Sequence, residues 1–210
     1  MIPLGMPRSK LSYVRLLHSL IGLWREEPAL RRATLTQALL FASFSAFWTV
    51  LAFYLADPAY GLGAEVAGLF GVIGVAGVVA APLAGRMADR RGARSVVLVG
   101  ALLVVLAWIL FETWLSLVGL ALGVILLDLG VQSALVAHQQ LIYGLRSEAR
   151  GRINTLFMTG MFLGGTLGSS LAMLAWQQGS WVSVGWVGLA LALTACLAAL
   201  AGKRSLQPAS

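Results

Sequence analysis

The 210-residue chain is 59% hydrophobic and only 11% charged, with a formal net charge of +7 and a mean hydropathy of +0.87. Soluble domains are about half apolar and about a quarter charged, so this chain has too few polar residues to cover a water-soluble core. The composition therefore excludes a soluble globular fold and predicts one membrane domain. The single cysteine, Cys196, lies in an apolar run, which excludes an intramolecular disulfide and a thiolate metal cluster.

Residues 1–33 contain no apolar run long enough to span a membrane, but they have a helical pattern. The apolar residues of one helical face are Leu11, Val14, Leu17, Ile21 and Trp24. The segment is predicted to be a basic amphipathic helix on the cytoplasmic membrane surface. The alternative is a partly ordered basic arm. Pro28, directly after two glutamates, predicts the start of a new helix.

Six apolar segments follow, each close to the length of about 20 residues that a spanning helix needs. They are residues 34–55, 66–84, 95–111, 115–143, 153–175 and 181–201. The fold class expected is an all-α membrane protein, with a six-helix domain over 34–201 and a short tail over 202–210.

The charged residues predict the orientation of these helices. If the N-terminus is cytoplasmic, the connections on that side are residues 1–33, 85–94, 144–152 and 202–210. These hold all 15 Lys and Arg residues, whereas the opposite side carries only Asp57, Glu65 and Glu112. This bias predicts a multi-pass protein of the inner (plasma) membrane with both termini in the cytoplasm. The basic residues are not interleaved with aromatic ones, so no nucleic-acid partner is expected.

The connection between the second and third apolar segments has a distinctive pattern. Gly85 is followed by Asp89 and Arg90, and then by Gly92 and Arg94. Glycines permit a tight reversal of the chain, an aspartate can cap a helix N-terminus, and arginines anchor the turn to the lipid surface. The pattern resembles the signature loop of the major facilitator superfamily. The alternative is a positively charged tight turn and nothing more.

The resemblance implies one six-helix half of a twelve-helix transporter, built from two inverted three-helix repeats. It also implies that the signature loop is a cytoplasmic gate, in which Asp89 meets the helix that begins near Arg152, Ile153 and Asn154. Two features favour the C-terminal half: the basic amphipathic segment before the first helix, and Asp128 where first halves usually carry an arginine. The clear signature loop is a counter-indication.

Glycines recur in the second and fifth apolar segments, the middle helices of the two expected repeats. They are Gly68, Gly71, Gly74 and Gly77, and Gly160, Gly164, Gly165 and Gly168. Small residues at this spacing allow helices to approach closely in lipid. The second set also resembles the antiporter motif of the family, but Gly165 stands where that motif has proline, so antiport is not established.

Polar residues form a stripe along one face of the fourth apolar segment. Asp128 lies near mid-bilayer, and Gln132, Gln139 and Tyr143 follow on the same helical face. A charge at this depth costs at least about 2.5 kcal/mol on insertion scales, so Asp128 should face protein or water. Asp128, Gln132 and Gln139 are candidates for a cavity wall with an ion-coupling carboxyl group. The alternative is a neutral, hydrogen-bonded structural aspartic acid.

Two further features concern the first and fourth segments. Gln37 and Trp48 share an arc with Phe41 and Ser45 that suits an organic substrate, although a helix-packing face explains it equally well. His138 lies near the cytoplasmic end of its helix, where it could shuttle protons, but we expect it to extend to the interface.

No phosphate-binding loop, nucleophile elbow or metal-binding histidine pair is present, so the chain is not expected to be an enzyme or to hold a cofactor. The resemblance predicts a secondary transporter that moves a small molecule by alternating access, in the efflux direction and coupled to an ion gradient, with protons as the expected ion. The alternative is a non-transporting membrane module, either a truncated remnant or an accessory subunit. Six helices alone would expose the polar stripe to lipid. We therefore expect a homodimer or a complex with a separate N-terminal half.

Overall fold

The computed structural model describes residues 13–58, 60–79 and 81–201, and every regular element within them is helical. The elements in chain order are α1 (Tyr13–Glu26), α2 (Pro28–Leu55), α3 (Ala64–Val79), α4 (Ala81–Arg91), α5 (Ala93–Thr113), α6 (Leu117–Tyr143), the 3-10 helix η1 (Ser147–Ala149), α7 (Arg150–Gln178) and α8 (Trp181–Ala201). Five stretches are long and apolar enough to cross a membrane: α2, α5, α6, η1 with α7, and α8. The shorter apolar helix Glu65–Val75 of α3 adds to them. The predicted all-α membrane fold is confirmed.

Most of the predicted helix boundaries agree closely with the structure. The last helix spans Trp181–Ala201, as expected, and α6 ends at Tyr143, as expected. The first span begins earlier than predicted, at Pro28 instead of residue 34. Proline is favoured in the first helical turn because its missing N–H would have no intrahelical partner there. Polar residues at the start of α2 lowered its hydropathy without interrupting the helix.

The second predicted span, residues 66–84, is wrong in its extent. Two helices occupy this region: α3 ends at Val79 and α4 runs from Ala81 to Arg91. Pro82 lies in the first turn of α4, where its ring does not clash with a preceding helical turn. The signature segment is therefore mostly helical instead of a loop over 85–94.

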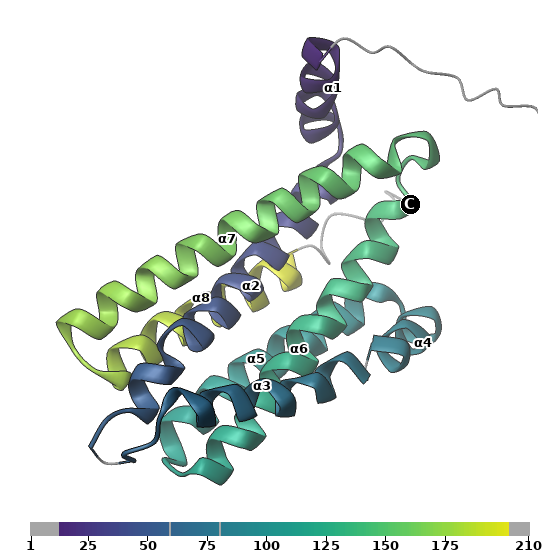
Figure 1. Ribbon diagram of the computed structural model, residues 1–210. Helices are drawn as coiled ribbons and strands as arrows, with labels where there is room; N and C mark the ends of the chain where they lie inside the picture. The colour runs from purple at the N-terminus through teal and green to yellow at the C-terminus, as the bar shows by residue number, and fades with distance from the viewer. Residues whose placement is uncertain (1–12, 59, 80, 202–210) are drawn as a thin grey trace, which may run out of the picture.

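The helices run antiparallel, so the chain connections gather at two ends of one bundle (Figure 1). The starts of α2, α5 and α7 lie at the same end as the C-termini of α4, α6 and α8, and α1 projects from this end (Figure 1). The basic residues of α2, α4, α5 and α7 are all near this end of their helices. At the other end lie Asp57, in the connection after α2, Glu65, in the first turn of α3, and Glu112, in the last turn of α5.

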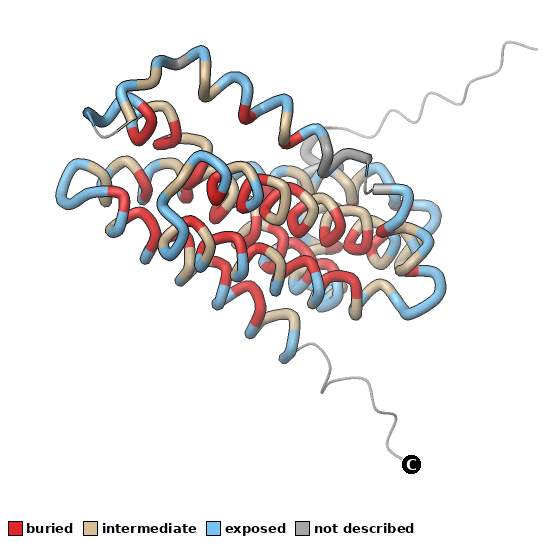
Figure 2. Tube along the Cα trace, turned by 90° about the horizontal axis from the view of Figure 1, so that it is seen from below, coloured by how far each residue is buried: buried red, intermediate tan, exposed pale blue. Residues whose placement is uncertain are grey.

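The main core is an aromatic cluster formed by α2, α5 and α8. Phe47 stacks on Phe111 with ring centroids 4.3 Å apart, and Trp108 and Trp181 meet Phe47 edge to face. Trp108 Nε1 donates to Ser43 Oγ at 2.7 Å, which satisfies a polar group that burial would otherwise leave unpaired. The buried residues follow the inner sides of the helices and the exposed ones the outer sides (Figure 2). This is the arrangement expected of a bundle with a lipid-facing exterior.

Glycines determine how closely the helices pack. A Cβ atom at Gly164 or Gly168 of α7 would overlap the backbone carbonyl group of Ala38 or Ala42 of α2. At Gly160 it would overlap the Thr34 side chain, and at Gly165 it would lie 2.8 Å from the Phe41 ring. Gly164 and Gly168 therefore bring α7 against the backbone of α2, and Gly160 and Gly165 make room for its side chains, as small residues do in membrane bundles.

Candidate functional site

Asp128 is buried between two helices in the middle of the bundle. Its side chain comes from α6 and is only 7% exposed. Across the interface lies α3, where a Cβ atom at Gly74 would be 3.2 Å from Asp128 Oδ2. The absence of a side chain at Gly74 therefore makes room for the carboxyl group. Among the described residues, none forms a hydrogen bond with Asp128 Oδ2.

This placement changes the interpretation of the polar stripe. Asp128 faces protein, as insertion energetics required, so it is not exposed to lipid by a single six-helix unit. Gln132 and Gln139 are half-buried. At the end of the stripe, Tyr143 Oη donates to Asn154 Oδ1 of α7 at 2.7 Å. Tyr143 of the stripe is thus hydrogen-bonded within the chain. Asp128, whose exposure to lipid would cost the most free energy, is covered by α3.

The prediction that His138 extends to the interface is wrong. Its side chain is 3% exposed, and a hydrogen bond of 2.9 Å joins His138 Nδ1 to Gln37 Oε1 of α2. The amide oxygen can only accept, so the imidazole N–H donates. Gln37 Nε2 lies 3.5 Å from the Val131 carbonyl oxygen. Gln37 of α2 and His138 of α6 therefore form a buried polar pair. Helical periodicity alone could not indicate this pairing.

Trp48 lies three turns beyond Gln37 on α2, in different surroundings. Its ring packs against Phe44 and Phe47, with centroids 6.0 and 5.5 Å away. Trp48 Nε1 is buried and has no hydrogen-bond partner within the described part of the chain. Gln37 and Trp48 thus share a helical arc, but the structure does not bring them to one site.

The signature segment forms a helix followed by a sharp turn. Gly92 is the single residue between α4 and α5, and its φ of 85° is one that residues other than glycine rarely adopt. Gly85 is inside α4, so it does not form the reversal. Asp89 is also inside α4 and does not cap α5, whose N-cap residue is Gly92. Arg94 lies in the first turn of α5.

The hydrogen bond of Asp89 differs from the contact that the resemblance implied. Asp89 Oδ1 accepts a hydrogen bond from Gln140 Nε2 of α6 at 3.4 Å. Asn154, one of the expected partners, is instead bonded to Tyr143. Both Asp89 and Arg90 are exposed. In this structure, therefore, the acid of the signature segment connects α4 to α6, and α7 is held by a separate contact.

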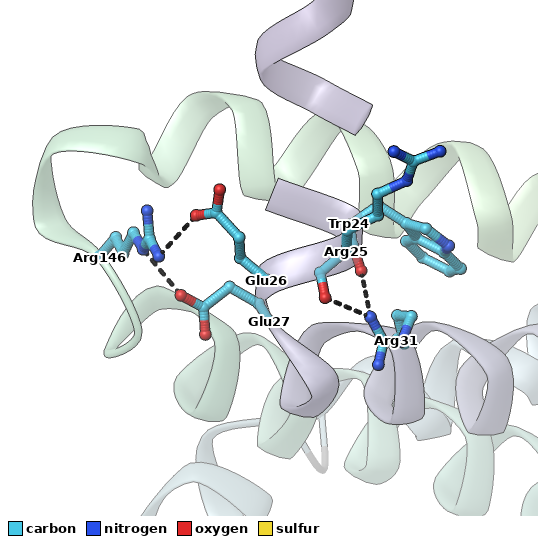
Figure 3. A network of polar contacts seen from close by, with 6 residues as sticks. All are labelled: Trp24, Arg25, Glu26, Glu27, Arg31 and Arg146. Carbon is cyan, nitrogen blue, oxygen red and sulfur yellow. Dashed lines mark hydrogen bonds and ion pairs between the residues drawn. The ribbon is translucent and has the colours of Figure 1, made fainter. Parts of the chain in front are cut away.

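A second group of charges joins α1 and α2 to the connection between α6 and α7 (Figure 3). Arg146 Nε lies 2.7 Å from Glu27 Oε1, and Arg146 Nη2 lies 3.0 Å from Glu26 Oε2. These hydrogen bonds, first to Glu27 and then to Glu26, raise the pKa of the Arg146 guanidinium. Arg31 Nη1 also donates to the carbonyl oxygens of Trp24 and Arg25 at 2.7 and 2.6 Å.

One further acid, which the sequence analysis did not single out, is half-buried. Glu112 is at the last turn of α5, and a Cβ atom at Gly185 of α8 would overlap its carboxyl group. Glu112 Oε1 is buried without a hydrogen-bond partner in the described residues. Its place near a predicted external helix end gave no signal of burial. The described residues contain no group of three or more His, Cys, Asp or Glu side chains that could hold a metal ion.

Comparison with known proteins identifies the class. The model of the major facilitator superfamily matches residues 33–209, so the chain belongs to this family of membrane transporters. "Uncharacterized transporter YgaY" of Escherichia coli O157:H7 is 36% identical over 196 residues, which cover 90% of this chain and 49% of the relative. "Probable transporter SCO4007" of Streptomyces coelicolor is 36% identical over 184 residues, covering 81% and 42%. The chain spans about half the length of the curated relatives it matches.

Proposed function

We propose that the chain forms the C-terminal six-helix half of a secondary transporter that exports a small molecule by alternating access coupled to an ion gradient. Family membership and the transporter relatives support transport as such. The match to about half of each relative supports a half unit. The amphipathic helix α1 before the first span supports the C-terminal half, because a central cytoplasmic connection would stand there.

The observation that carries the coupling proposal is the burial of Asp128. A carboxyl group at mid-membrane is expensive, and intramembrane acids mark ion pathways more often than packing sites. Here one carboxyl oxygen lacks a hydrogen-bond partner in the described residues, and it lies against Gly74 of another helix. A fully structural acid would be expected to be paired. Asp128 is therefore suited to exchange a proton when α3 and α6 move relative to each other.

The other candidate residues of the sequence take further roles in transport. Gln132 and Gln139 line the same face of α6 towards the substrate path, and Trp48 contributes from α2, whereas Gln37 is buried in its pair with His138. Gly85, Asp89, Arg90, Gly92 and Arg94 form the cytoplasmic gate, in which Asp89 releases Gln140 in one of the two states. The gathering of basic residues at one end of the bundle supports a plasma-membrane orientation with both termini, residues 1–33 and 202–210, in the cytoplasm.

The test separates coupling from transport. The assembled protein is reconstituted into liposomes with an internal pH-sensitive dye, and a panel of organic cations and sugars is applied across a proton gradient. Asp128→Asn retains size and hydrogen bonding but cannot titrate. We expect it to lose solute-driven proton flux while it still exchanges labelled solute for unlabelled solute. Glu112→Gln, the control at a half-buried acid of α5, should retain both activities.

Two results would contradict the proposal. If Asp128→Asn couples solute and proton movement as well as the unmodified chain across the neutral pH range, Asp128 is a structural group. If neither the chain alone nor the chain with a co-expressed N-terminal half moves any solute of the panel, the non-transporting module becomes the better reading.

A further inference from the structure

A cavity lies among the helix ends at the basic end of the bundle. Its volume is about 520 Å³, and it is lined by α2, α5, α6 and α8. The lining extends from Pro28 to Thr36 of α2, which is about 12 Å along the helix at 1.5 Å per residue. The cavity is separate from the α3–α6 interface that contains Asp128, because none of its described lining residues belongs to α3.

Its walls are apolar over most of their surface. The largest contributions come from small and aliphatic side chains on four helices, among them Ala29, Val97, Ile142 and Ala199. Protein interiors are close-packed, with few voids larger than a water molecule. An apolar hollow of this size among spanning helices is therefore suited to a hydrocarbon chain, and a small soluble anion would leave most of it unfilled.

The mouth of the cavity is positively charged. Arg32 of the second turn of α2 and Arg94 of the first turn of α5 both line it and are exposed. Both helices also begin here. The N-cap residues are Glu27 for α2 and Gly92 for α5, and neither helix has a side-chain capping hydrogen bond. Exposed N–H groups of a helix N-terminus and arginine guanidinium groups both favour phosphate.

None of the described residues that line the cavity is Asp or Glu. Glu27 precedes the cavity residue Pro28 along the chain, but its carboxylate is engaged by Arg146 at 2.7 Å. Arginine from two helices, two helix N-termini and apolar walls therefore converge on one small region.

We infer that this cavity binds an anionic phospholipid of the surrounding membrane. One acyl chain occupies the apolar hollow, and the phosphate lies between Arg32 and Arg94. Basic pockets between membrane helices are suited to acidic headgroups, and lipid is the only abundant amphiphile of this chemistry at this depth. The bound lipid would connect the starts of α2 and α5 to the ends of α6 and α8.

Native mass spectrometry of the purified, delipidated chain tests this inference. Phosphatidylglycerol and phosphatidylcholine with the same acyl chains are added in turn, and the bound fraction is measured. We expect phosphatidylglycerol to be retained preferentially. Arg32→Gln/Arg94→Gln should weaken its binding about tenfold, because each basic residue near an anionic headgroup contributes severalfold. The charge-matched control, Arg25→Gln/Arg86→Gln, removes two exposed arginines outside the cavity lining and should bind normally.

A second variant addresses the hydrocarbon chain. Ala199→Phe fills the hollow without a change of charge, and it should also reduce phosphatidylglycerol binding. Equal retention of phosphatidylcholine would overturn the inference in favour of an apolar groove. Full competition by glycerol phosphate would overturn it in favour of a free-anion site. Equal losses in the cavity variant and the charge-matched control would attribute binding to diffuse charge.

Discussion

At the scale of single residues, each buried polar side chain depends on the helix that packs against it: Asp128 of α6 lies against Gly74 of α3, and His138 is bonded to Gln37 of α2. The sequence indicated that Asp128 must avoid lipid, because a mid-bilayer charge is costly, and the structure buries it. It could not indicate that Gly74 provides the space, since helical periodicity defines a face but not the helix that packs against it. The same limit explains His138: its position near a helix end suggested the interface, whereas Gln37 of another helix holds it in the interior.

The α7 glycines allow a prediction at this scale. Gly164→Ala should destabilise the protein, because the new methyl group would overlap the Ala38 carbonyl group and force α7 away from α2. Overpacking of this kind typically costs about 1–3 kcal/mol. The thermal unfolding midpoint in detergent micelles measures the effect.

Gly71→Ala is the matched control, since Gly71 is exposed on α3 and a Cβ atom there would meet nothing within 4 Å. It should be neutral or stabilising, because glycine costs about 0.5–1 kcal/mol relative to alanine inside a helix. Equal shifts for the two variants would mean that Gly164 affects helix propensity and not packing.

At the scale of the elements, hydropathy predicted the spanning helices well and the signature segment poorly. α8 begins and ends as expected because Trp181 and Ala201 bound a continuous apolar run. Charged residues between Gly85 and Arg91 suggested a loop, although α4 continues through them. Hydropathy indicates burial in lipid and not backbone hydrogen bonding. A hydropathy pattern therefore predicts a loop where a polar helix lies at the membrane surface. Only Gly92, with its positive φ, is the turn that the glycine pattern predicted.

The ion pairs of Arg146 with Glu26 and Glu27 lead us to expect that they hold α1 to the bundle (Figure 3). Arg146→Gln should release the α1–α2 junction from the α6–α7 connection, because it removes both ion pairs at once. The mobility of a spin label at Ile21, an exposed residue of α1, should rise. Arg86→Gln, an exposed arginine of α4, should leave the label unchanged.

A charge exchange tests the pairing itself. Arg146→Glu combined with Glu27→Arg should restore the low mobility that Arg146→Glu alone abolishes. The effect should weaken at high salt, because exposed ion pairs are screened. If the exchanged pair remains as mobile as the single variant, α1 is positioned by packing and not by these charges.

At the scale of the whole molecule, the segregation of charge is the feature that sequence and structure share most completely. Because antiparallel helices bring alternate connections together, the basic connections form one end of the bundle and the acidic ones the other (Figure 1). Reporter fusions after Gly63 and after Gln178 should therefore be external. Fusions at Arg91, at Ser147 and at the C-terminus should be cytoplasmic. A single stable fusion with the opposite location would contradict the six-span orientation.

The reason to expect a partner for the chain is no longer an acid exposed to lipid. Asp128 is covered by α3 within one chain, so an exposed acid no longer requires a partner. Two other arguments still favour a partner. The chain spans about half the length of its transporter relatives, and alternating access rocks two halves around a site between them. Gln132 of α6 and Trp48 of α2 are only half-buried and would face such a partner.

Cysteine cross-linking in membranes tests whether the active form is a parallel homodimer or a complex with a separate N-terminal half. Cys196→Ala provides the background, and single cysteines replace Gln132 or Trp48. These should cross-link to a second copy or to a co-expressed half. A cysteine at Leu106 should not, because Leu106 is 48% exposed on α5, among the outward-facing aliphatic residues Leu102 and Ile109. Equal cross-linking at Leu106 would indicate random collision in the membrane. A purified monomer that transports a solute unaided would rule out the assembly altogether.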